Sequence, residues 1–242
     1  MKRNIIIWFC LLPSMIYGQN LIAKYQVTKT VSSGNSEGIK SFELPLSGLL
    51  YRKGSQYIYW EEPQYLNKYP KGIIDFNLGN EQVSLILSTD SVQSVFYTNF
   101  DNHIQRVAAI NSSVATYENE FDDDFALDWV YKQETKTIDG LKCQLAVNSN
   151  QWSVWFCADI PCRSGIFNIR GLPGLVVEAD WLAAKAHYKL ISYDTQSKVA
   201  DDIFNLKILK TNVVKGDRLK SNKLPREKTK EQKRLELINQ NH

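Results

Sequence analysis

Histidine is scarce in this chain, and its three copies are scattered. His103, His187 and His242 form none of the spacings with which histidine ligands hold a metal ion. A phosphate-binding loop is also lacking. The segment Gly171–Val176 is not followed by Lys-Ser or Lys-Thr, and its Pro173 has no N–H to offer a phosphate. These absences argue against a histidine metal centre and a nucleotide-binding P-loop, and we expect no cofactor.

Long apolar runs are absent apart from one near the start of the chain. Two basic residues precede the run Ile5–Ile16, and the small residue Gly18 follows it. This pattern predicts a secretory signal peptide over residues 1–18, too short to span a membrane. Gln19 would then begin an exported protein in the periplasm or beyond. Cys10 lies inside the run rather than after it, which argues against a lipoprotein.

Excess charge of one sign is missing from the chain as a whole, whose formal net charge is +3. Without the two basic residues of the signal peptide the net charge is +1. Lys215–His242 carries nine basic and four acidic residues, a net +5, which leaves −4 for Gln19–Val214. Nucleic acid is a poor partner for an exported protein, so we interpret Lys215–His242 as a solvated basic tail.

Helical periodicity is missing before Arg226–Ile238, which has the pattern of a short helix with Pro225 at its start. Alternating patterns typical of strands dominate instead. We therefore predict a mainly β fold in a single domain over residues 19–214. We expect an antiparallel meander that forms a curved sheet or partly open barrel, followed by a short C-terminal helix or tail. The expected strands and hairpins are Ala23–Val31, Gly48–Arg52 with Gln56–Trp60, Ile73–Leu78 with Gln82–Ser88, Val92–Phe100, His103–Ile110 and Val114–Tyr117, and Ser32–Gly38 is expected to be a loop.

The most informative stretch is Gly171–Trp181. Pro173 sets φ for the second position of a β-turn, and Gly174 provides the positive φ that a type II turn needs at its third position. From Leu175 onward, residues alternate in the manner of a strand. The sequence thus predicts a stiff corner that leads into a central or half-buried strand.

The residues Gly171, Leu172, Pro173, Gly174, Leu175 and Val176 resemble the signature of the GLPGLI family, envelope proteins of Gram-negative bacteria with no established activity. The resemblance covers roughly Trp129–Asp180 and is weak outside it. Its further elements are Trp129, Lys136–Cys143, Trp155-Phe156, Ile160-Pro161, Gly165, Glu178 and Asp180. The resemblance implies an exported protein and carries no catalytic residues with it.

This sequence departs from the family pattern at Phe156, Cys157 and Ile166, where tyrosine, threonine and proline are usual. Cys162 is a further addition. These departures suggest a subgroup with its own cross-link.

A turn at Ser149-Asn150 joins two apolar segments, Leu141–Val147 and Trp152–Ala158. One register places all the apolar residues on a single buried face, and a slip of one residue would destroy that face. This register pairs Val147 with Trp152, Leu145 with Val154, Cys143 with Phe156 and Leu141 with Ala158. It directs Cys143 and Cys157 to opposite faces of the sheet.

The three cysteines of the exported chain are Cys143, Cys157 and Cys162. They have the softness to hold a metal such as copper, but an oxidising compartment favours a disulfide. Residues 158–161 are enough chain to turn back and bring Cys157 and Cys162 together. We predict a Cys157–Cys162 disulfide, with Cys143 as a buried free thiol.

Two other motifs have ordinary explanations. Gly34–Gly38 matches G-x-S-x-G, but the segment after it ends at Pro45 and is no helix, so a flexible loop accounts for it better than a serine nucleophile. Glu118–Asp124 is rich in carboxylates that calcium could use. It lacks the glycine and the spacing of a known calcium loop, and a solvated turn is the simpler account.

Aromatic residues gather in one segment outside the strand patterns, Trp60–Pro70. It is long and bracketed by prolines, which predicts an exposed loop. Trp60, Tyr65 and Tyr69 are the side chains that we expect to contact a ligand or partner.

Two classes of function remain. The first is an exported, non-catalytic envelope protein: a binding module, a carrier or an accessory to a transporter. Its partner would be an envelope protein, an outer-membrane transporter among the candidates, or an apolar ligand. The alternative is a periplasmic hydrolase or peptidase, for which Glu178, Asp180 and His187 are the best available residues. No nucleic acid and no integral membrane segment are expected.

Overall fold

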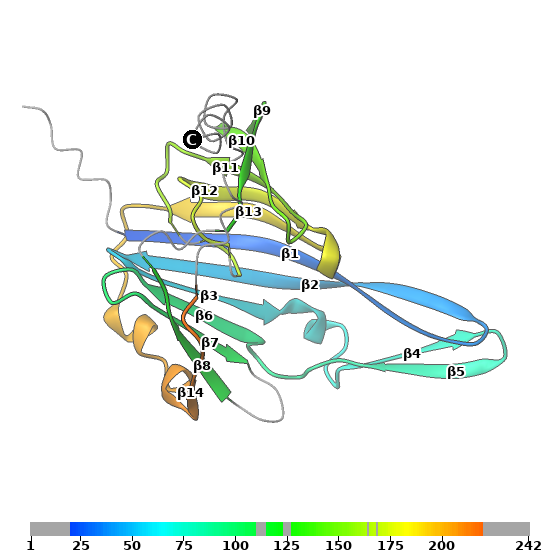
Figure 1. Cartoon of the computed structure of the whole chain (residues 1–242). Helices are drawn as coiled ribbons and strands as arrows, with labels where there is room; N and C mark the ends of the chain where they lie inside the picture. The colour runs from blue at the N-terminus through cyan, green and yellow to red at the C-terminus, as the bar shows by residue number, and fades with distance from the viewer. Residues whose placement is uncertain (1–19, 110–114, 123–126, 164, 168, 220–242) are drawn as a thin grey trace, which may run out of the picture.

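The computed structural model describes residues 20–109, 115–122, 127–163, 165–167 and 169–219. Within them the chain is mainly β, and twelve strands form one large sheet that does not close into a barrel (Figure 1). The predicted mainly β, antiparallel fold is confirmed. Among the described strands of this sheet, β14 is the exception in direction, since it pairs with β8 in parallel.

The strands of the large sheet lie in the spatial order β14-β8-β7-β6-β3-β2-β1-β13-β12-β11-β10-β9. Their bounds are β1 Asn20–Asn35, β2 Gly38–Lys53, β3 Gln56–Pro63, β6 Ser94–Asn99, β7 Ile104–Ala109, β8 Ala115–Glu120, β9 Val130–Ile138, β10 Leu141–Val147, β11 Trp152–Cys157, β12 Leu175–Trp181, β13 Ala186–Asp194 and β14 Val213–Lys215. Two further strands, β4 (Ile73–Leu78) and β5 (Glu81–Ile86), pair only with each other.

The sequence pattern of β1 explains its place in the sheet. Leu21, Ala23, Tyr25 and Val27 are buried, while the residues between them are less buried or exposed. Because successive strand residues point to opposite faces, this alternation gives β1 one face buried in the core and one face more exposed to solvent. The predicted hairpins β2–β3 and β4–β5 also form.

The predicted loop Ser32–Gly38 is wrong. The ladder between β1 and β2 runs from the pair Asn20 and Lys53 to the pair Asn35 and Gly38, so only residues 36–37 form the turn. Serine and glycine are weak strand formers, but pairing along a continuous ladder overrides that preference. The ends of β1 and β2 project together with β4 and β5 beyond the rest of the sheet (Figure 1).

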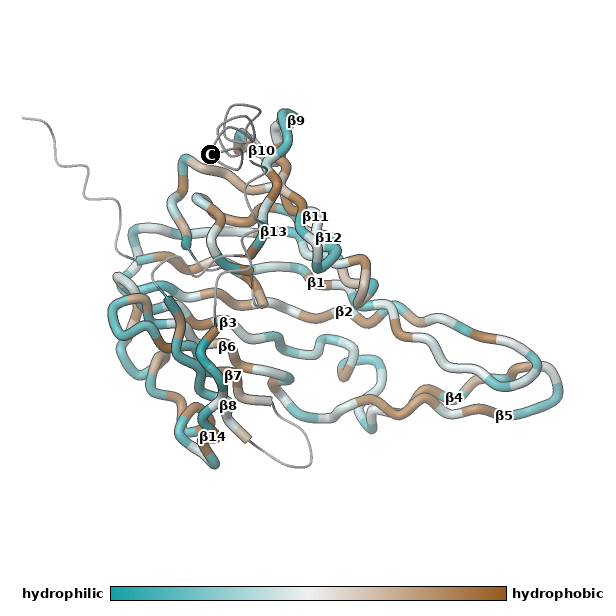
Figure 2. The backbone as a smooth tube through the Cα atoms, in the orientation of Figure 1, coloured by the Kyte–Doolittle hydropathy of each residue, from teal (hydrophilic) through white to brown (hydrophobic). Residues whose placement is uncertain are grey.

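These projecting segments, residues 31–42 of β1 and β2 with residues 73–86 of β4 and β5, are called the arm. Apolar side chains pack inside the arm, where the rings of Phe42 and Phe76 lie 4.9 Å apart. The ammonium of Lys40 lies 5.4 Å from the Phe76 ring centre. Apolar residues of β4 and β5 are visible along the arm in Figure 2. At the tip, the amide N–H of Asn80 donates to the carboxylate of Glu37 at 3.2 Å.

The described residues of the connection between β11 and β12 (158–163, 165–167 and 169–174) pack onto one face of the large sheet, called here the inner face. Phe167 in this connection contacts Phe96 of β6, with ring centres 4.5 Å apart, and also approaches Trp152 of β11. In sheet order β6 and β11 are six strands apart. That distance would be roughly 29 Å in a flat sheet. One side chain reaches both strands because the sheet curves around the connection, whose Ile166, Ile169 and Leu172 are buried.

The predicted register of the β10–β11 hairpin is wrong by one residue. Leu145 pairs with Trp155 and Val147 with Ser153, rather than with Val154 and Trp152. Irregularities in the pairing of β10 with β9, and of β11 with β12, shift the side chains along these strands. A single unbroken alternation therefore does not describe the hairpin. The one-residue difference in register also overturns the expected separation of Cys143 and Cys157 to opposite faces. Continuing the observed ladder places these two cysteines opposite each other, on one face of the sheet.

Gly174 is required for a different reason from the one that the sequence suggests. It does not have the positive φ of a type II turn; Gly171 does, with φ of 80°. A Cβ at Gly174 would instead lie 2.1 Å from the carbonyl oxygen of Cys157 and 2.8 Å from Cα of Ala158. Glycine is needed here because two backbone segments touch.

The C-terminal part of the described chain crosses the opposite face of the large sheet, called here the outer face. Short 3-10 helices η3 (Asp201–Asn205) and η4 (Lys207–Lys210) place Phe204 and Leu209 against Ile58 and Tyr97 in a second apolar cluster. Beyond β14, the amide of Leu219 donates to the carbonyl of Glu120. The predicted helix Arg226–Ile238 and the signal peptide lie outside the described residues. No helix in the described ranges is long and apolar enough to span a membrane.

Candidate functional site

A buried ion pair lies on the inner face of the sheet. Glu61 on β3 is 3% exposed, and its carboxylate is paired with the ammonium of Lys29 on β1. The hydroxyl of Tyr59 donates to the same carboxylate at 3.0 Å. Tyr188 also lies close to Glu61, although its hydroxyl has no hydrogen-bond partner of regular geometry in the described part of the chain. A lone buried carboxylate is costly, so Lys29 and Tyr59 are what Glu61 needs to remain there.

Burial controls the ionisation of the tyrosines around Glu61. It raises the pKa of Tyr59 and of Tyr188 well above the ordinary value, and the negative charge of Glu61 raises both further. Both phenols therefore stay protonated at neutral pH, and Tyr59 donates its proton to the carboxylate of Glu61. Gly48 on β2 leaves room for this cluster, since a Cβ there would lie 2.6 Å from the Tyr59 hydroxyl.

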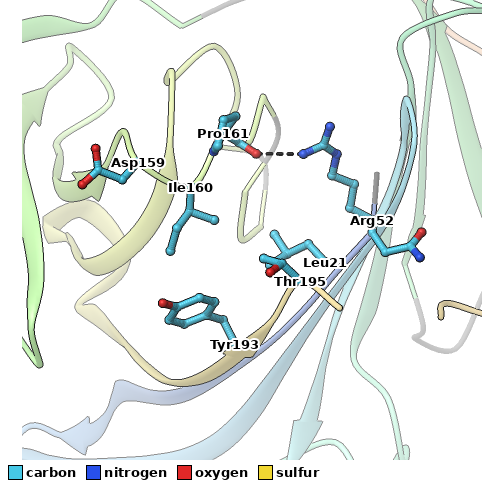
Figure 3. Close-up of a pocket in the computed structure, with 8 residues that line it drawn as sticks. Leu21, Arg52, Asp159, Ile160, Pro161, Tyr193 and Thr195 are labelled. Carbon is cyan, nitrogen blue, oxygen red and sulfur yellow. Dashed lines mark hydrogen bonds between the residues drawn. The ribbon is translucent and has the colours of Figure 1, made fainter. Parts of the chain in front are cut away.

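A cavity of about 230 Å³ lies where the start of β1, the end of β2 and the β11–β12 connection meet (Figure 3). Its walls include the buried Leu21 together with Ile160 and Tyr193. Arg52 points its guanidinium toward Pro161 and donates to that carbonyl at 2.8 Å, as drawn in Figure 3. That volume would hold several waters or a small ligand.

The guanidinium of Arg52 is held by contacts with other parts of the protein rather than extending freely into this cavity. Besides the bond to Pro161, its Nε donates to the carbonyl of Gly54 at 3.0 Å. The guanidinium carbon lies 5.5 Å from the ring centre of Tyr57. These contacts tie β2 and β3 to the β11–β12 connection, and they occupy two of the guanidinium's N–H donors.

The residues expected for a hydrolase separate into two pairs on the outer face. Glu178 forms an ion pair with Lys136 at 2.6 Å. Asp180 instead contacts His187, whose Nδ1 lies 2.8 Å from the carboxylate oxygen. Thr28 on β1 is the cross-strand neighbour of His187, so Asp180, His187 and Thr28 form a row across three strands. The structure thus brings Asp180 and His187 together and gives Glu178 a separate partner.

The predicted aromatic contact loop is not an exposed loop. Trp60 belongs to β3 and stacks on Tyr51, with ring centres 5.1 Å apart. Tyr65 lies in the 3-10 helix η1 (Gln64–Asn67) and is only 2% exposed. Tyr69 is partly buried against the main core. The segment is polar and aromatic in sequence, but its rings pack against the rest of the protein. Trp60 packs on the outer face of the sheet, and Tyr65 and Tyr69 pack against the main core.

The structure holds Cys143, Cys157 and Cys162 as buried thiols, so the predicted Cys157–Cys162 disulfide is not formed. Burial raises the pKa of Cys143 to about 11, and the nearby Cys157 contributes to that rise. Among the described residues, no group of three or more His, Cys, Asp or Glu side chains is arranged to hold a metal ion.

The two remaining motifs are placed as follows. Ser36 of the G-x-S-x-G match lies in the turn at the tip of the arm, with strands rather than a helix on both sides. In the acidic run, Glu118 pairs with Arg106 at 2.6 Å and Asp122 with Arg218 at 2.8 Å. Residues 123–124 of that run lie outside the described ranges.

Comparison with known proteins adds little to these observations. No protein-family model matches the chain, and no curated protein matches it in sequence. Among solved structures, PNGF-II in two crystal forms is similar at 18% identity and a TM-score of 0.48, over 82% of this chain and 31% of PNGF-II. The chain thus spans about a third of that protein. A DUF1329 family protein from Desulfovibrio piger is similar at 8% identity and a TM-score of 0.31, over 77% of this chain and 90% of that protein.

Proposed function

We propose that this is an exported, non-catalytic envelope protein that binds a partner protein through its arm. The observation that carries the proposal is the isoleucine pair on the solvent side of β4 and β5. Ile86 is 79% exposed, its cross-strand neighbour Ile73 is 43% exposed, and both lie on a projecting element. Exposed β-branched residues beside each other on such an element are typical of an interaction surface.

The arm is preorganised for such a contact. Phe42 and Phe76 pack inside it, and the side-chain amide of Asn35 on β1 donates to Glu81 on β5. A surface held in place before binding loses little conformational entropy when the partner arrives.

A carrier of an apolar ligand is less well supported than a partner-binding protein. The inner face, where such a ligand would lie, is covered by the described part of the β11–β12 connection, with Ile166, Ile169 and Leu172 buried against it. The cavity beside Arg52 is below the usual size of a site for a drug-sized ligand.

The proposal of export is supported by the signal peptide that the sequence predicts over residues 1–18, and the envelope location also by the resemblance to the GLPGLI family. An outer-membrane transporter is the partner that we propose within that compartment. Hydrolysis is the second candidate function, and it is favoured by the contact of Asp180 with His187 next to Thr28. Turnover of an ester or peptide by the purified protein, lost in His187→Ala, would establish it.

Site-specific photo-cross-linking in the native host tests the arm. A photoreactive residue at Ile86 is expected to yield a defined adduct with one envelope protein. The same residue at Tyr117 on β8, 49% exposed and outside the arm, is the matched control and should give none. Ile86→Asp should abolish capture without changing the melting temperature. Identical adducts at both positions, or none at position 86, would contradict the proposal.

A further inference from the structure

β5 is the outer strand of the arm. Lys40 and Phe42 of β2 contact Phe76 of β4, and in Figure 1 β5 lies on the side of β4 that faces away from β2. Among the described strands β5 pairs only with β4, so its second edge has no strand beside it. A free edge of this kind carries a row of backbone N–H and C=O groups with which a further strand can pair.

The pairing of β4 with β5 determines which backbone groups point outward. The amide of Leu87 donates to the carbonyl of Gly72 at 2.7 Å, so these two residues form a hydrogen-bonded pair. Hydrogen-bonded and non-hydrogen-bonded pairs alternate along an antiparallel ladder. The non-hydrogen-bonded residues of β5 are therefore Gln82, Ser84 and Ile86. Their N–H and C=O groups point away from β4, along the free edge.

The β5 edge lacks the features that protect the two edges of the large sheet. Lysine, bulges, proline and very short strands are the usual protection of an edge. The edge strand β9 has Lys132, Lys136 and an irregular pairing with β10, and the edge strand β14 has three residues with Lys215 among them. β5 has six residues in regular pairing, without lysine or proline. Its edge is therefore open to a further strand.

The exposed side chains of β5 suit an added strand with an apolar residue in it. Ile86 is 79% exposed on the same face as Ile73, its neighbour on β4. Directly opposite side chains on neighbouring strands lie about 5 Å apart. An apolar side chain on the added strand would lie beside Ile86 on this face, and its burial would stabilise the complex.

The arm carries a net negative charge. Its acidic residues are Glu37, Asp75 and Glu81, and its basic residue is Lys40, which gives 1 − 3 = −2. Lys40 lies over the Phe76 ring, and no cationic side chain in the described part of the chain forms an ion pair with the three carboxylates. A partner segment with a lysine or an arginine would complement this charge.

We propose that the partner of the arm adds an extended segment to the β5 edge as a further strand, with an apolar residue beside Ile86 and a lysine or arginine near the carboxylates. This inference rests on the proposed function, because it names the part of the partner that the arm binds. In such strand addition, main-chain hydrogen bonds give the affinity and alternate side chains give the specificity.

Ser84 provides a matched pair of variants. Ser84→Pro removes the outward N–H without removing a ladder bond to β4. Ser84→Ala keeps that N–H, and both variants lose the hydroxyl that donates to Asp75. Photo-cross-linking from position 86 in the native host is repeated in each variant. Ser84→Pro should lower the yield of the adduct about tenfold, and Ser84→Ala should leave it unchanged.

Amide hydrogen exchange in the purified wild-type complex gives a second measurement, which does not depend on the folding of Ser84→Pro. The amides of Ser84 and Ile86 should exchange more slowly when the partner is bound. Those of Val83 and Leu85 already belong to the ladder with β4 and should change little. Sequencing of the cross-linked peptide should place a lysine or an arginine beside the apolar residue that reacted.

The outcomes separate this inference from the proposed function. Absence of any adduct at position 86 in the wild type would contradict the proposed function and this inference with it. Equal yields in Ser84→Pro and Ser84→Ala, whether both high or both low, would contradict strand addition and leave the arm as a binding surface. Unchanged exchange at Ser84 and Ile86 in the complex, or a cross-linked peptide without a basic residue, would do the same.

Discussion

Tyr25 on the first strand donates its buried hydroxyl to the carbonyl of Val176, the last residue of the family-like signature, at 2.9 Å. In sheet order β13 lies between their strands, so this bond spans a neighbouring strand rather than belonging to the ladder. Burial raises the pKa of Tyr25 well above the ordinary value, which keeps the donor protonated. The signature is thus joined to β1 from within the core, and its position is fixed by contacts on both sides.

The close approach at Gly174 gives the first prediction. Gly174→Ala should destabilise the protein by about 3 kcal/mol or more, because the new Cβ would meet the carbonyl of Cys157 at 2.1 Å. Gly140→Ala is the control, since Gly140 has φ of 83° but no atom within 4 Å of the added Cβ. It should cost only about 1 kcal/mol. Urea unfolding measures both, and a larger loss at position 140 would refute the steric explanation.

Cys143 provides a pH prediction. Its pKa of about 11 in the folded protein, against 9.0 for a free thiol, gives about a hundredfold fewer thiolates at pH 8. We expect iodoacetamide to label Cys143 only after unfolding. A raised folded pKa means that the associated stability is complete below pH 9 and is lost as the pH rises through 11. Cys143→Ala should flatten that part of the stability profile.

Peptide mapping under non-reducing conditions is the companion measurement. It distinguishes the three buried thiols from the Cys157–Cys162 bridge that the sequence predicts. A bridge to Cys143 would contradict both arrangements.

The arm should unfold locally when its apolar packing is removed. Phe76→Ala deletes a ring that contacts Phe42 and lies under Lys40. We expect faster amide hydrogen exchange in β4, β5 and the ends of β1 and β2, with the rest of the sheet unchanged. Ile86→Ala is the control, because Ile86 is exposed and its loss should leave exchange as it was. Uniformly faster exchange after Phe76→Ala would show that the arm is not a separate unit.

Local patterns predicted much of this fold. The alternation in β1 and the turn residues between β2 and β3 are properties of neighbouring residues, and both expectations were confirmed. The failures depend on contacts between distant segments. The composition of Ser32–Gly38 predicts a loop, but its pairing with the start of β2 makes most of it strand. The pattern around Gly174 predicts a turn glycine, but glycine is needed there because the backbone of Cys157 lies beside it.

The candidate sites were harder to predict for the same reason. Asp180 and His187 were named from the sequence, but their mutual contact follows from the register of β12 with β13. The aromatic residues around Glu61 dominate the pattern of its segment, so the sequence does not single out Glu61 as a site residue. A signal did exist, because Tyr57, Tyr59 and Glu61 share one face of β3, and that places a carboxylate on an apolar face.

The buried ion pair is the basis of the last prediction. Glu61→Gln should cost about 3 kcal/mol, because Lys29 loses its counter-charge while Tyr59 keeps only a neutral acceptor. The loss falls at the lower end for buried pairs because the Lys29 side chain is 25% exposed and regains water. Glu62→Gln, next in sequence and bonded to Trp60 on the other face, is the control and should change stability by less than about 0.5 kcal/mol.

The double variant Lys29→Met, Glu61→Gln should recover part of the loss, since no unpaired charge remains. The measurement is the unfolding free energy of the wild type, Glu61→Gln, Glu62→Gln and the double variant. Equal losses in Glu61→Gln and in the double variant would show that the pair contributes through packing rather than charge.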